Sequence, residues 1–382
     1  MRNSKPHIRA QTLEELKKQF ADWKYPMFRV TQLLHWLYAQ RVSDWSEMCN
    51  LPKALRDRLA EAFAIDRMSV VRTQGARDTT RKFLWKLTDG AMVESVLIPA
   101  NPALYGDSSD RHTLCVSTQV GCAYGCKFCA SGLDGWKRNL GAEEIVDQVL
   151  AVEEIGAEER SGAPGGPAVE ASRESTRGVR MVNNLVIMGM GEPLANYDNL
   201  LKALGILNAA WGGGIGARKI TVSTSGLAPQ IRKLAAEPYQ FQLAISLHGA
   251  TDLVRNRIMP INHKYPIEEL TNACTDYVKA KGRMITIEYI LIAGVNDGLD
   301  QVKPLSELAR RLHAKVNLIP YNSVDGLTWR RPEDQHQTAF AAALSRQNVP
   351  TTLRREKGHD IDAACGQLRL RTEREEASQT GS

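Results

Sequence analysis

The chain has 382 residues, of which 43% are hydrophobic and 24% are charged. This composition is ordinary for a globular protein and allows one large core and a smaller accessory domain. No apolar run approaches the roughly 18–20 residues of a membrane span, and the first residues lack the apolar stretch of a secretory signal. We therefore expect a cytoplasmic protein that does not enter the membrane. The formal net charge of +6 only slightly favours a polyanionic partner.

The first part of the chain is expected to form a small helical domain, residues 1–68. Between residues 11 and 64 the apolar side chains recur at three- and four-residue spacing, which is typical of amphipathic helices. The domain carries Trp23, Trp36 and Trp45. These rings could bind a polyanionic partner or form the core of the domain, and the sequence leaves both interpretations open.

Residues 69–112 are predicted to form a β-hairpin and a linker. The segment Thr88–Gly90 is a good hairpin turn, and Glu94 follows it on the second strand. Strand alternation puts Glu94 on the same face as Met92 and Val96. Without further information, the simpler interpretation of Glu94 is a charge that protects an exposed edge strand.

From residue 113 to residue 370, short β-branched runs alternate with helical ones. Repeated strand-helix units imply an α/β fold with a parallel sheet, closed fully or partly into a barrel. In such barrels the loops after the carboxyl ends of the strands carry the chemistry. Residues 157–180 are rich in Gly, Ser and Pro and are expected to be a disordered insertion. Residues 371–382 are expected to be a flexible tail.

Three of the seven cysteines form a CxxxCxxC motif after a predicted strand. The sequence VGCAYGCKFCASG contains Cys122, Cys126 and Cys129, with glycines that let the loop turn tightly. Three thiolate ligands on a four-iron cluster leave one iron open for chemistry. The alternatives are a structural zinc loop and a ferredoxin, but both require a fourth ligand that does not follow nearby. The motif matches that of the radical S-adenosylmethionine (SAM) superfamily.

Further long motifs extend over nearly the whole chain. They are STQVGC at 117–122, GWKRNL at 135–140, MGMGEPLANYDN at 188–199, ITVSTSG at 220–226, LAISLHGA at 243–250, LIPYN at 318–322 and GHDIDAACGQL at 358–368. Together they resemble the radical-SAM adenine-C2 methyltransferases that act on 23S ribosomal RNA and transfer RNA. The resemblance implies a partial β/α barrel with an N-terminal helical accessory domain and a small β-hairpin extension.

The resemblance also implies cofactors and partners. The cofactors are one 4Fe-4S cluster with three cysteine ligands and SAM at its open iron, with two SAM molecules used per turnover. One SAM methylates a cysteine, and the other is cleaved to a radical that takes a hydrogen from this methyl group. The implied partners are 23S ribosomal RNA, transfer RNA and a low-potential, flavodoxin-like electron donor, and the implied state is a monomer.

Three residues take catalytic roles by this resemblance. Cys365 corresponds to the cysteine that carries the methyl group, although a lone cysteine is more often an inert small apolar residue. Cys115 corresponds to the cysteine that resolves the transient protein–RNA link, and its simpler interpretation is a buried strand residue. Glu94 corresponds to the acceptor of the proton from the adenine ring, and partial desolvation would favour this role.

Seven residues match the SAM contacts of the family, and they follow predicted strands. They are Gly191, Glu192, Ser223, Ser246, Leu247, His248 and Asn322. Individually each is a weak signal, but strand ends directed at one cavity are a stronger one. The Glu192 carboxylate is expected to pair with the ammonium group of SAM.

Three rival interpretations remain. An adenine-C8 methyltransferase shares the cluster and both reactive cysteines. A non-enzymatic iron-sulfur RNA-binding protein would use the cluster structurally and would not cleave SAM. A radical enzyme acting on a peptide or small molecule would produce no methylated nucleoside.

Overall fold

A ten-stranded sheet organises the chain in the computed structural model, which describes residues 5–76, 79–100, 110–160, 180–354 and 366–380. The neighbouring strands follow the order β1-β2-β3-β4-β7-β8-β9-β10-β11-β12. Their bounds are β1 Ser69–Gly75, β2 Arg81–Lys86, β3 Met92–Pro99, β4 His112–Cys115, β7 Asn184–Ile187, β8 Ile220–Thr224, β9 Gln242–Ser246, β10 Ile285–Leu291, β11 Ala314–Pro320 and β12 Thr351–Leu353.

The strands β1 to β4 pair antiparallel, whereas those from β4 onward pair parallel. The order runs from β1 to β12 without a pairing between these two strands in the described residues, so the barrel is partial. The α/β fold, with its hairpin extension, is confirmed. A separate hairpin pairs β5 Gln119–Gly121 with β6 Trp136–Asn139.

Helices connect the strands of the parallel part. Buried leucine, isoleucine and alanine side chains on their inner faces pack against the sheet and form the core. Their bounds are α5 Ala142–Arg160, α7 Tyr197–Asn208, α8 Ala228–Ala236, α9 Asp252–Ile258, α10 Ile267–Lys281, α11 Val302–Arg311 and α12 Asp334–Arg346. None of the helices within the described ranges is both long and apolar enough to cross a membrane.

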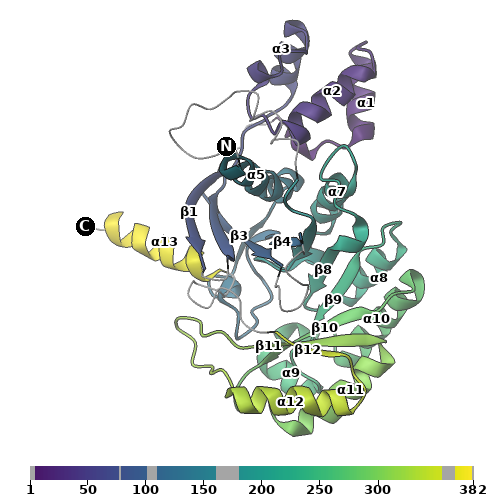
Figure 1. Cartoon of the computed structure of the whole chain (residues 1–382), viewed down its shortest axis with the longest axis vertical. Helices are drawn as coiled ribbons and strands as arrows, with labels where there is room; N and C mark the ends of the chain where they lie inside the picture. Colours follow the sequence, from purple (N-terminus) through teal and green to yellow (C-terminus); the bar gives the residue numbers. More distant parts are fainter. Residues whose placement is uncertain (1–4, 77–78, 101–109, 161–179, 355–365, 381–382) are drawn as a thin grey trace.

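The N-terminal residues form helices α1 Leu13–Asp22, α2 Phe28–Leu34 and α3 Lys53–Ala62, as the apolar spacing predicts. They lie at the end of the molecule near α5 and α7, away from α11 and α12 (Figure 1). The N-terminus of α1 has a capping box between Thr12 and Glu15. The three tryptophans of this region are partly buried against the core, which favours their structural interpretation.

Two expectations about irregular segments are wrong. Helix α5 continues to Arg160, where Glu159 pairs with Arg81 at 2.8 Å, so residues 157–160 are not part of a disordered insertion. Residues 161–179 lie outside the described residues. Residues 371–380 do not form a flexible tail but belong to helix α13 Gln367–Thr380, which lies beside β3 (Figure 1).

Helix α13 forms because its start is anchored in the core and its polar face is paired internally. Leu368 packs against Leu84 and Met92. Arg369 pairs with Glu373 at 2.8 Å, four residues along the helix. The polar composition of residues 371–382 does not reveal this anchoring, because tertiary contacts stabilise the helix despite its low average hydrophobicity.

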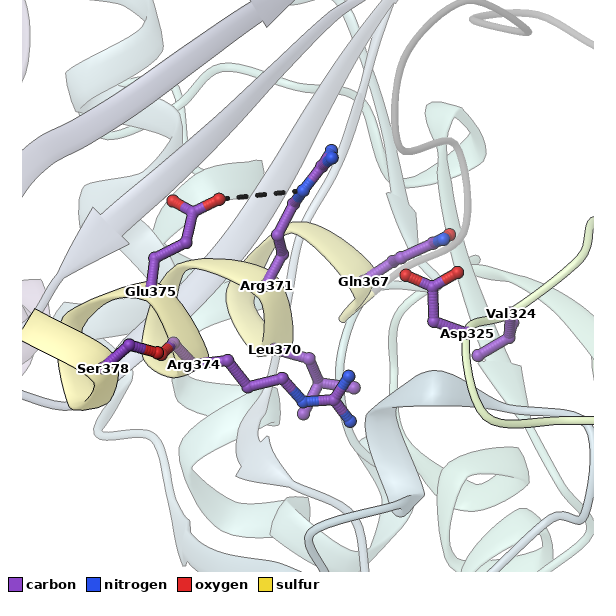
Figure 2. A pocket seen from close by; sticks show the side chains of 8 residues that line it. All are labelled: Val324, Asp325, Gln367, Leu370, Arg371, Arg374, Glu375 and Ser378. Atoms are coloured by element: carbon purple, nitrogen blue, oxygen red, sulfur yellow. Dashed lines mark hydrogen bonds and ion pairs between the residues drawn. The ribbon is translucent and has the colours of Figure 1, made fainter.

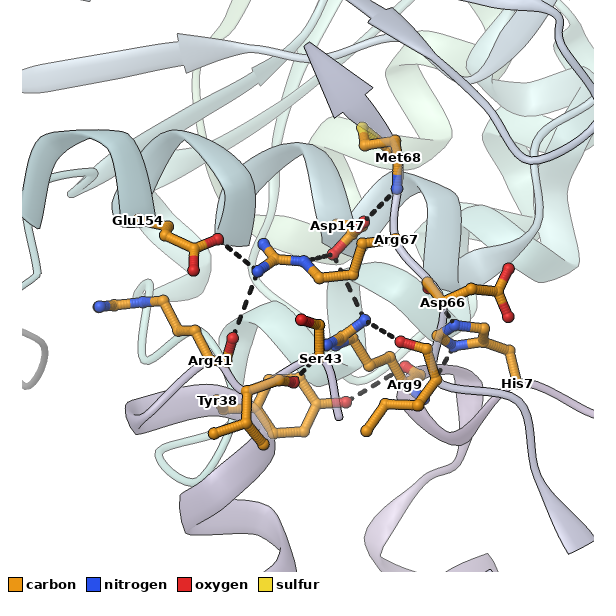
Figure 3. A network of polar contacts seen from close by, with 12 residues as sticks. His7, Arg9, Tyr38, Arg41, Ser43, Asp66, Arg67, Met68, Asp147 and Glu154 are labelled. Carbon is orange, nitrogen blue, oxygen red and sulfur yellow. Dashed lines mark hydrogen bonds and ion pairs between the residues drawn. The ribbon is translucent and has the colours of Figure 1, made fainter. Parts of the chain in front are cut away.

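A buried ionic network joins the N-terminal helices to α5 (Figure 3). The carboxylate of Asp147 on α5 lies 3.1 Å from Arg67 Nε and 3.7 Å from Arg9 Nη1, and it also accepts a hydrogen bond from the Met68 N–H. Arg67 also pairs with Glu154. The Arg9 side chain is fully buried and the Asp147 side chain is 5% exposed. The network therefore attaches the N-terminal domain to the barrel through charges that depend on one another.

We expect Asp147→Ala to destabilise the protein by about 3–5 kcal/mol, because it leaves two buried guanidinium groups without their shared carboxylate. Chemical denaturation, combined with hydrogen exchange of α1 to α3, measures the effect. Asp57→Ala is the matched control, because it breaks the exposed Lys53–Asp57 pair on α3. An equal loss of stability in the two variants would contradict the importance of the network.

Candidate active site

The three cysteines of the CxxxCxxC motif lie in the loop between β5 and β6. The hairpin closes this loop, and the Cys122 N–H donates to the Gly135 oxygen at 3.0 Å. Gly121 has a φ of 75°, and a Cβ atom there would lie 1.9 Å from the Gly135 oxygen. Only glycine fits this close approach. The sequence therefore specifies the turn that starts the cysteine loop.

The three thiols act on one another electrostatically. Burial, with a smaller contribution from the charge of Cys129, raises the pKa of Cys122 to about 12. Burial also raises the pKa of Cys126, with contributions from Cys129 and Cys122. A bound metal would offset these penalties, because it stabilises thiolates.

The donor set of the cysteine loop fits an iron-sulfur cluster. Cys122, Cys126 and Cys129 are three thiols of one short loop, and cysteine thiolates are the usual ligands of such clusters. Within the described ranges, no group of three or more His, Cys, Asp or Glu side chains could hold a single metal ion.

Gly191 and Glu192 follow β7, as predicted. Gly191 has a φ of 98°, which glycine adopts readily. The Glu192 carboxylate is buried; its Oε2 accepts from the N–H and the hydroxyl of Ser225, both at 2.7 Å, and its Oε1 accepts from the Leu194 N–H at 3.0 Å. Burial raises the pKa of Glu192, and these donors oppose that shift. The carboxylate is thus held in one orientation next to the ends of β7 and β8.

The predicted residues at the ends of β8 and β9 also lie close together. The hydroxyl oxygens of Ser223 and Ser246 are 3.4 Å apart. The Leu247 carbonyl accepts from Arg255 Nε at 3.0 Å. His248 contacts the ring of Phe128 in the cysteine loop edge-on, with ring centroids 5.0 Å apart. The motif after β9 therefore contacts the cysteine loop directly.

His248 is neutral at pH 7. Burial, aided by the charge of Arg255, lowers its pKa to about 3. Its Nδ1 atom accepts a hydrogen bond from the Ile290 N–H at 3.0 Å. His248 therefore provides a fixed uncharged ring rather than a cation at this strand end.

A cavity of about 260 Å³, here called the central cavity, brings together several of the predicted residues. Its walls include Cys115 on β4, Cys129 in the cysteine loop and Asn322 after β11. Val96 on β3 also lines it. Glu192, Ser223 and the residues Ser246–His248 do not line this cavity but occupy neighbouring strand ends.

The Glu94 carboxylate is buried between β2 and α13. Lys82 Nζ lies 3.1 Å from Glu94 Oε2. The N–H groups of Gly366 and Arg369 donate to the two carboxylate oxygens at 2.9 Å and 2.7 Å. Glu94 thus caps the N-terminus of α13, where helical N–H groups lack partners within the helix. This burial rules out the interpretation of Glu94 as an exposed edge-strand charge.

Cys365 lies outside the described residues, but the residue that follows it is described. Gly366 has a φ of 88° and contacts Ser131, two residues after Cys129. A Cβ atom at Gly366 would lie 2.9 Å from the Ser131 hydroxyl oxygen. The start of α13 is therefore packed between the cysteine loop and Glu94.

Sequence reasoning missed three polar residues that hold this site together: Lys82, Ser225 and Arg255. Lys82 alternates with Leu84 on one face of β2, and an inward lysine in a strand could have been noticed. Ser225 belongs to a recognised motif but was not assigned a role. Arg255 lies in a short helix with no distinctive pattern, so only the tertiary structure identifies it.

A second cavity, of about 300 Å³, lies between α13 and the loop at Val324–Asp325 (Figure 2). Val324 lines both this cavity and the central one, so the two adjoin. Its walls carry Arg371 and Arg374 but also Asp325 and Glu375, and Arg371 pairs with Glu375 at 3.7 Å. The opposite charges offset one another, so this groove alone does not indicate a phosphate site.

Comparisons with known proteins agree with this geometry. Residues 116–303 match the model of the radical SAM superfamily, and residues 8–65 match that of the ribosomal RNA large subunit methyltransferase N-terminal domain. A crystal structure of a radical SAM methyltransferase from Sphaerobacter thermophilus has a TM-score of 0.82 and 41% identity, and the match covers 95% of this chain and 98% of that one.

Curated relatives match over almost their full length. A probable dual-specificity RNA methyltransferase RlmN from Akkermansia muciniphila is 49% identical over 375 residues, which cover 98% of each chain. A probable dual-specificity RNA methyltransferase RlmN 3 from Opitutus terrae is 51% identical over 97% of this chain and 96% of that one. With both domains matched in order, the chain belongs to the RlmN family of radical SAM RNA methyltransferases.

Proposed function

We propose that this enzyme methylates C2 of an adenine in 23S ribosomal RNA and of an adenine in transfer RNA. The reaction follows a ping-pong route through a methylated cysteine and a transient protein–RNA link. The relatives named as dual-specificity RNA methyltransferases support two RNA substrates, and the match to a ribosomal RNA large subunit methyltransferase N-terminal domain supports the ribosomal one. The central cavity, which Cys115 and Cys129 both line, carries the proposal, because it joins a candidate reactive thiol to the cysteine loop.

Membership of the radical SAM superfamily implies a 4Fe-4S cluster and SAM. We further propose that Cys122, Cys126 and Cys129 are the cluster ligands, that SAM binds the remaining iron, and that two SAM molecules are used per turnover. When bound, these cofactors supply the one-electron chemistry that a carbon–hydrogen bond of adenine requires. A flavodoxin-like protein donates the electron, and the enzyme acts as a cytoplasmic monomer.

The strand-end residues orient SAM in this proposal. The Glu192 carboxylate, held by Ser225, has acceptor capacity left for the ammonium group of SAM. Ser223, Ser246 and Asn322 offer hydroxyl and amide groups. The remaining predicted contacts are the backbone at Gly191 and the residues Leu247 and His248.

Three residues of the chain carry out the remaining steps. Cys365 holds the methyl group as a thioether and links to the adenine through that carbon. Cys115 then attacks the Cys365 sulfur and forms a disulfide with it; the bond between this sulfur and the carbon breaks, and the carbon keeps the electron pair and takes up a proton to become the methyl group of the released base. Glu94 accepts the proton that leaves the adenine ring. The Cys115 side chain is buried, which keeps this thiol away from competing oxidants in solvent.

The adenine must leave its base stack to reach the central cavity. The cavity lies at the carboxyl ends of the strands and is walled by β3, β4, β10 and β11. A single-stranded or looped RNA with the base turned outward is therefore the expected substrate, because it costs less to unstack.

Mass spectrometry of nucleosides tests the proposed function. Reconstituted enzyme reacts anaerobically with SAM, a reductant and 23S or transfer RNA, and 2-methyladenosine is the expected product. The variant Cys126→Ala should lack both the brown cluster and the product, whereas Cys49→Ala, which removes an exposed cysteine, should retain both. Appearance of 8-methyladenosine would select the C8 alternative, and no methylated nucleoside would contradict the proposal.

We expect Cys115→Ala to trap the enzyme covalently on RNA, because no thiol remains to displace the Cys365 sulfur. Denaturing gel electrophoresis with labelled RNA should then reveal a slow band that protease removes. Cys274→Ala, a change of a buried cysteine on α10, is the control and should give no such band. Full turnover by Cys115→Ala would refute the assignment.

We expect Glu94→Gln to cleave SAM but to release less than one hundredth of the wild-type methylated product. This loss is the typical size of general-base catalysis, roughly 10²–10⁴-fold. The amide keeps only one of the two accepting oxygens and removes the charge that faces Lys82, so a melting temperature measured alongside separates a loss of fold from a loss of catalysis. Parallel measurement of SAM cleavage and product yield separates these outcomes. A normal yield would remove Glu94 from the mechanism.

A further inference from the structure

Arg255 on α9 is a fully buried cation whose hydrogen bonds go to neutral groups. Its Nε donates to the Leu247 carbonyl at 3.0 Å, its Nη1 to Asn262 Oδ1 at 2.6 Å, and its Nη2 to the Ser225 carbonyl. Among the residues that the structure describes, no carboxylate forms an ion pair with it. Such a charge is costly to bury, and a carboxylate partner would be the usual compensation.

The nearest acidic side chain on the same helix is already occupied. Asp252 Oδ1 accepts from Asn262 Nδ2 at 2.7 Å and from the Ile267 N–H at 2.9 Å. Burial lowers the pKa of Arg255 to about 10, so the group stays protonated at pH 7. The guanidinium charge is therefore compensated by neutral acceptors, and the Cys126 thiol of the cysteine loop is among the groups near it.

The acceptors of Arg255 belong to the segments that carry the proposed SAM contacts. Ser225, whose carbonyl accepts from Arg255, donates its N–H and hydroxyl to Glu192. Leu247 lies in the segment that follows β9. Arg255 therefore ties together the segments after β8 and β9 and orients Glu192 through Ser225.

The cysteine loop is attached to the same helix. The Lys127 N–H, between Cys126 and Cys129, donates to the Ile258 carbonyl at the end of α9, at 2.9 Å. The backbone around Arg255 is tightly packed, because a Cβ atom at Gly249 would lie 2.7 Å from the Arg255 Cα. Helix α9, which carries Arg255, is therefore bonded to the cysteine loop and packed against the segment after β9.

We propose that Arg255 is a positioning residue of the cofactor site: its guanidinium fixes the segments that bind SAM, and its buried charge favours the reduced form of the iron-sulfur cluster. The inference rests on the proposed cluster ligands. Reduction adds one negative charge to a cluster that already has three thiolate ligands, and a nearby buried cation stabilises that charge. Both effects come from one side chain that contacts neither SAM nor the cluster in the proposal.

Two measurements on the reconstituted full chain test the proposal. A redox titration monitored by electron paramagnetic resonance gives the potential of the cluster, and calorimetry gives the affinity of the oxidised enzyme for SAM. In Arg255→Met we expect at least a tenfold lower equilibrium constant for reduction, equal to a potential more negative by about 59 mV. We also expect at least tenfold weaker SAM binding. Arg257→Met is the matched control, because Arg257 is exposed on the same helix and lies over Trp329.

Arg255→Lys separates charge from geometry. Lysine keeps the positive charge but cannot bond three fixed acceptors in a planar fork. We expect the equilibrium constant for reduction of Arg255→Lys to stay within threefold of the wild-type value, while SAM binding weakens. If Arg255→Met fails to fold or to bind iron, the Arg255→Lys variant decides the question. An unchanged SAM affinity in Arg255→Lys would then overturn the proposal.

Equal potentials and equal SAM affinities in Arg255→Met and Arg257→Met would also overturn it. These readouts need no RNA, so they are independent of the nucleoside product. A wild-type enzyme that yields a different nucleoside would contradict the proposed function, yet the shift in potential would still support the role of Arg255.

Discussion

Parallel pairing from β4 to β12 brings the carboxyl ends of seven strands to one edge of the sheet, where the polar groups of the site are buried. Burial there imposes a strict condition, because every carboxylate, hydroxyl and guanidinium needs a partner in place of water. Glu192 meets it through Ser225 and Leu194. Arg255 meets it through carbonyls of the same loops. The bonds that satisfy burial are therefore also the bonds that orient the site.

The same condition explains the arrangement around Glu94. Glu94 and Lys82 face each other on adjacent strands with almost no exposure, and the carboxylate also receives two N–H groups from α13. This bonding connects positions 272 and 275 residues apart in the chain. The start of α13 depends on it, and with it the backbone next to Cys365. In the proposed mechanism the carboxylate that accepts a proton is therefore also the group that anchors the start of α13.

Buried ion pairs also join the N-terminal domain to the barrel. Arg9 and Arg67 share the carboxylate of Asp147 on α5, within a network that also contains Glu154. Buried charges of this kind add less net stability than apolar contacts of equal size, but they penalise any displacement strongly. The domain is thus held in one orientation relative to the sheet.

The sequence by itself determined the local features of the protein. The CxxxCxxC spacing and Gly121 specify the cysteine loop, the alternation after Gly90 puts Glu94 on a strand, and the segments after each apolar run identify the strand ends. Local turns and periodicity are encoded within a few residues, so they can be recognised without the fold.

Only the tertiary structure decided which distant side chains meet. The partners of Glu94 lie on β2 and α13, and the second of these elements has a composition typical of a flexible tail. Arg255 belongs to a helix of seven residues without a distinctive pattern, yet it joins the segments after β8 and β9 beside the cysteine loop. The burial and pairing of single polar groups depend on contacts across the whole sheet. The periodicity of the sequence does not reveal such contacts.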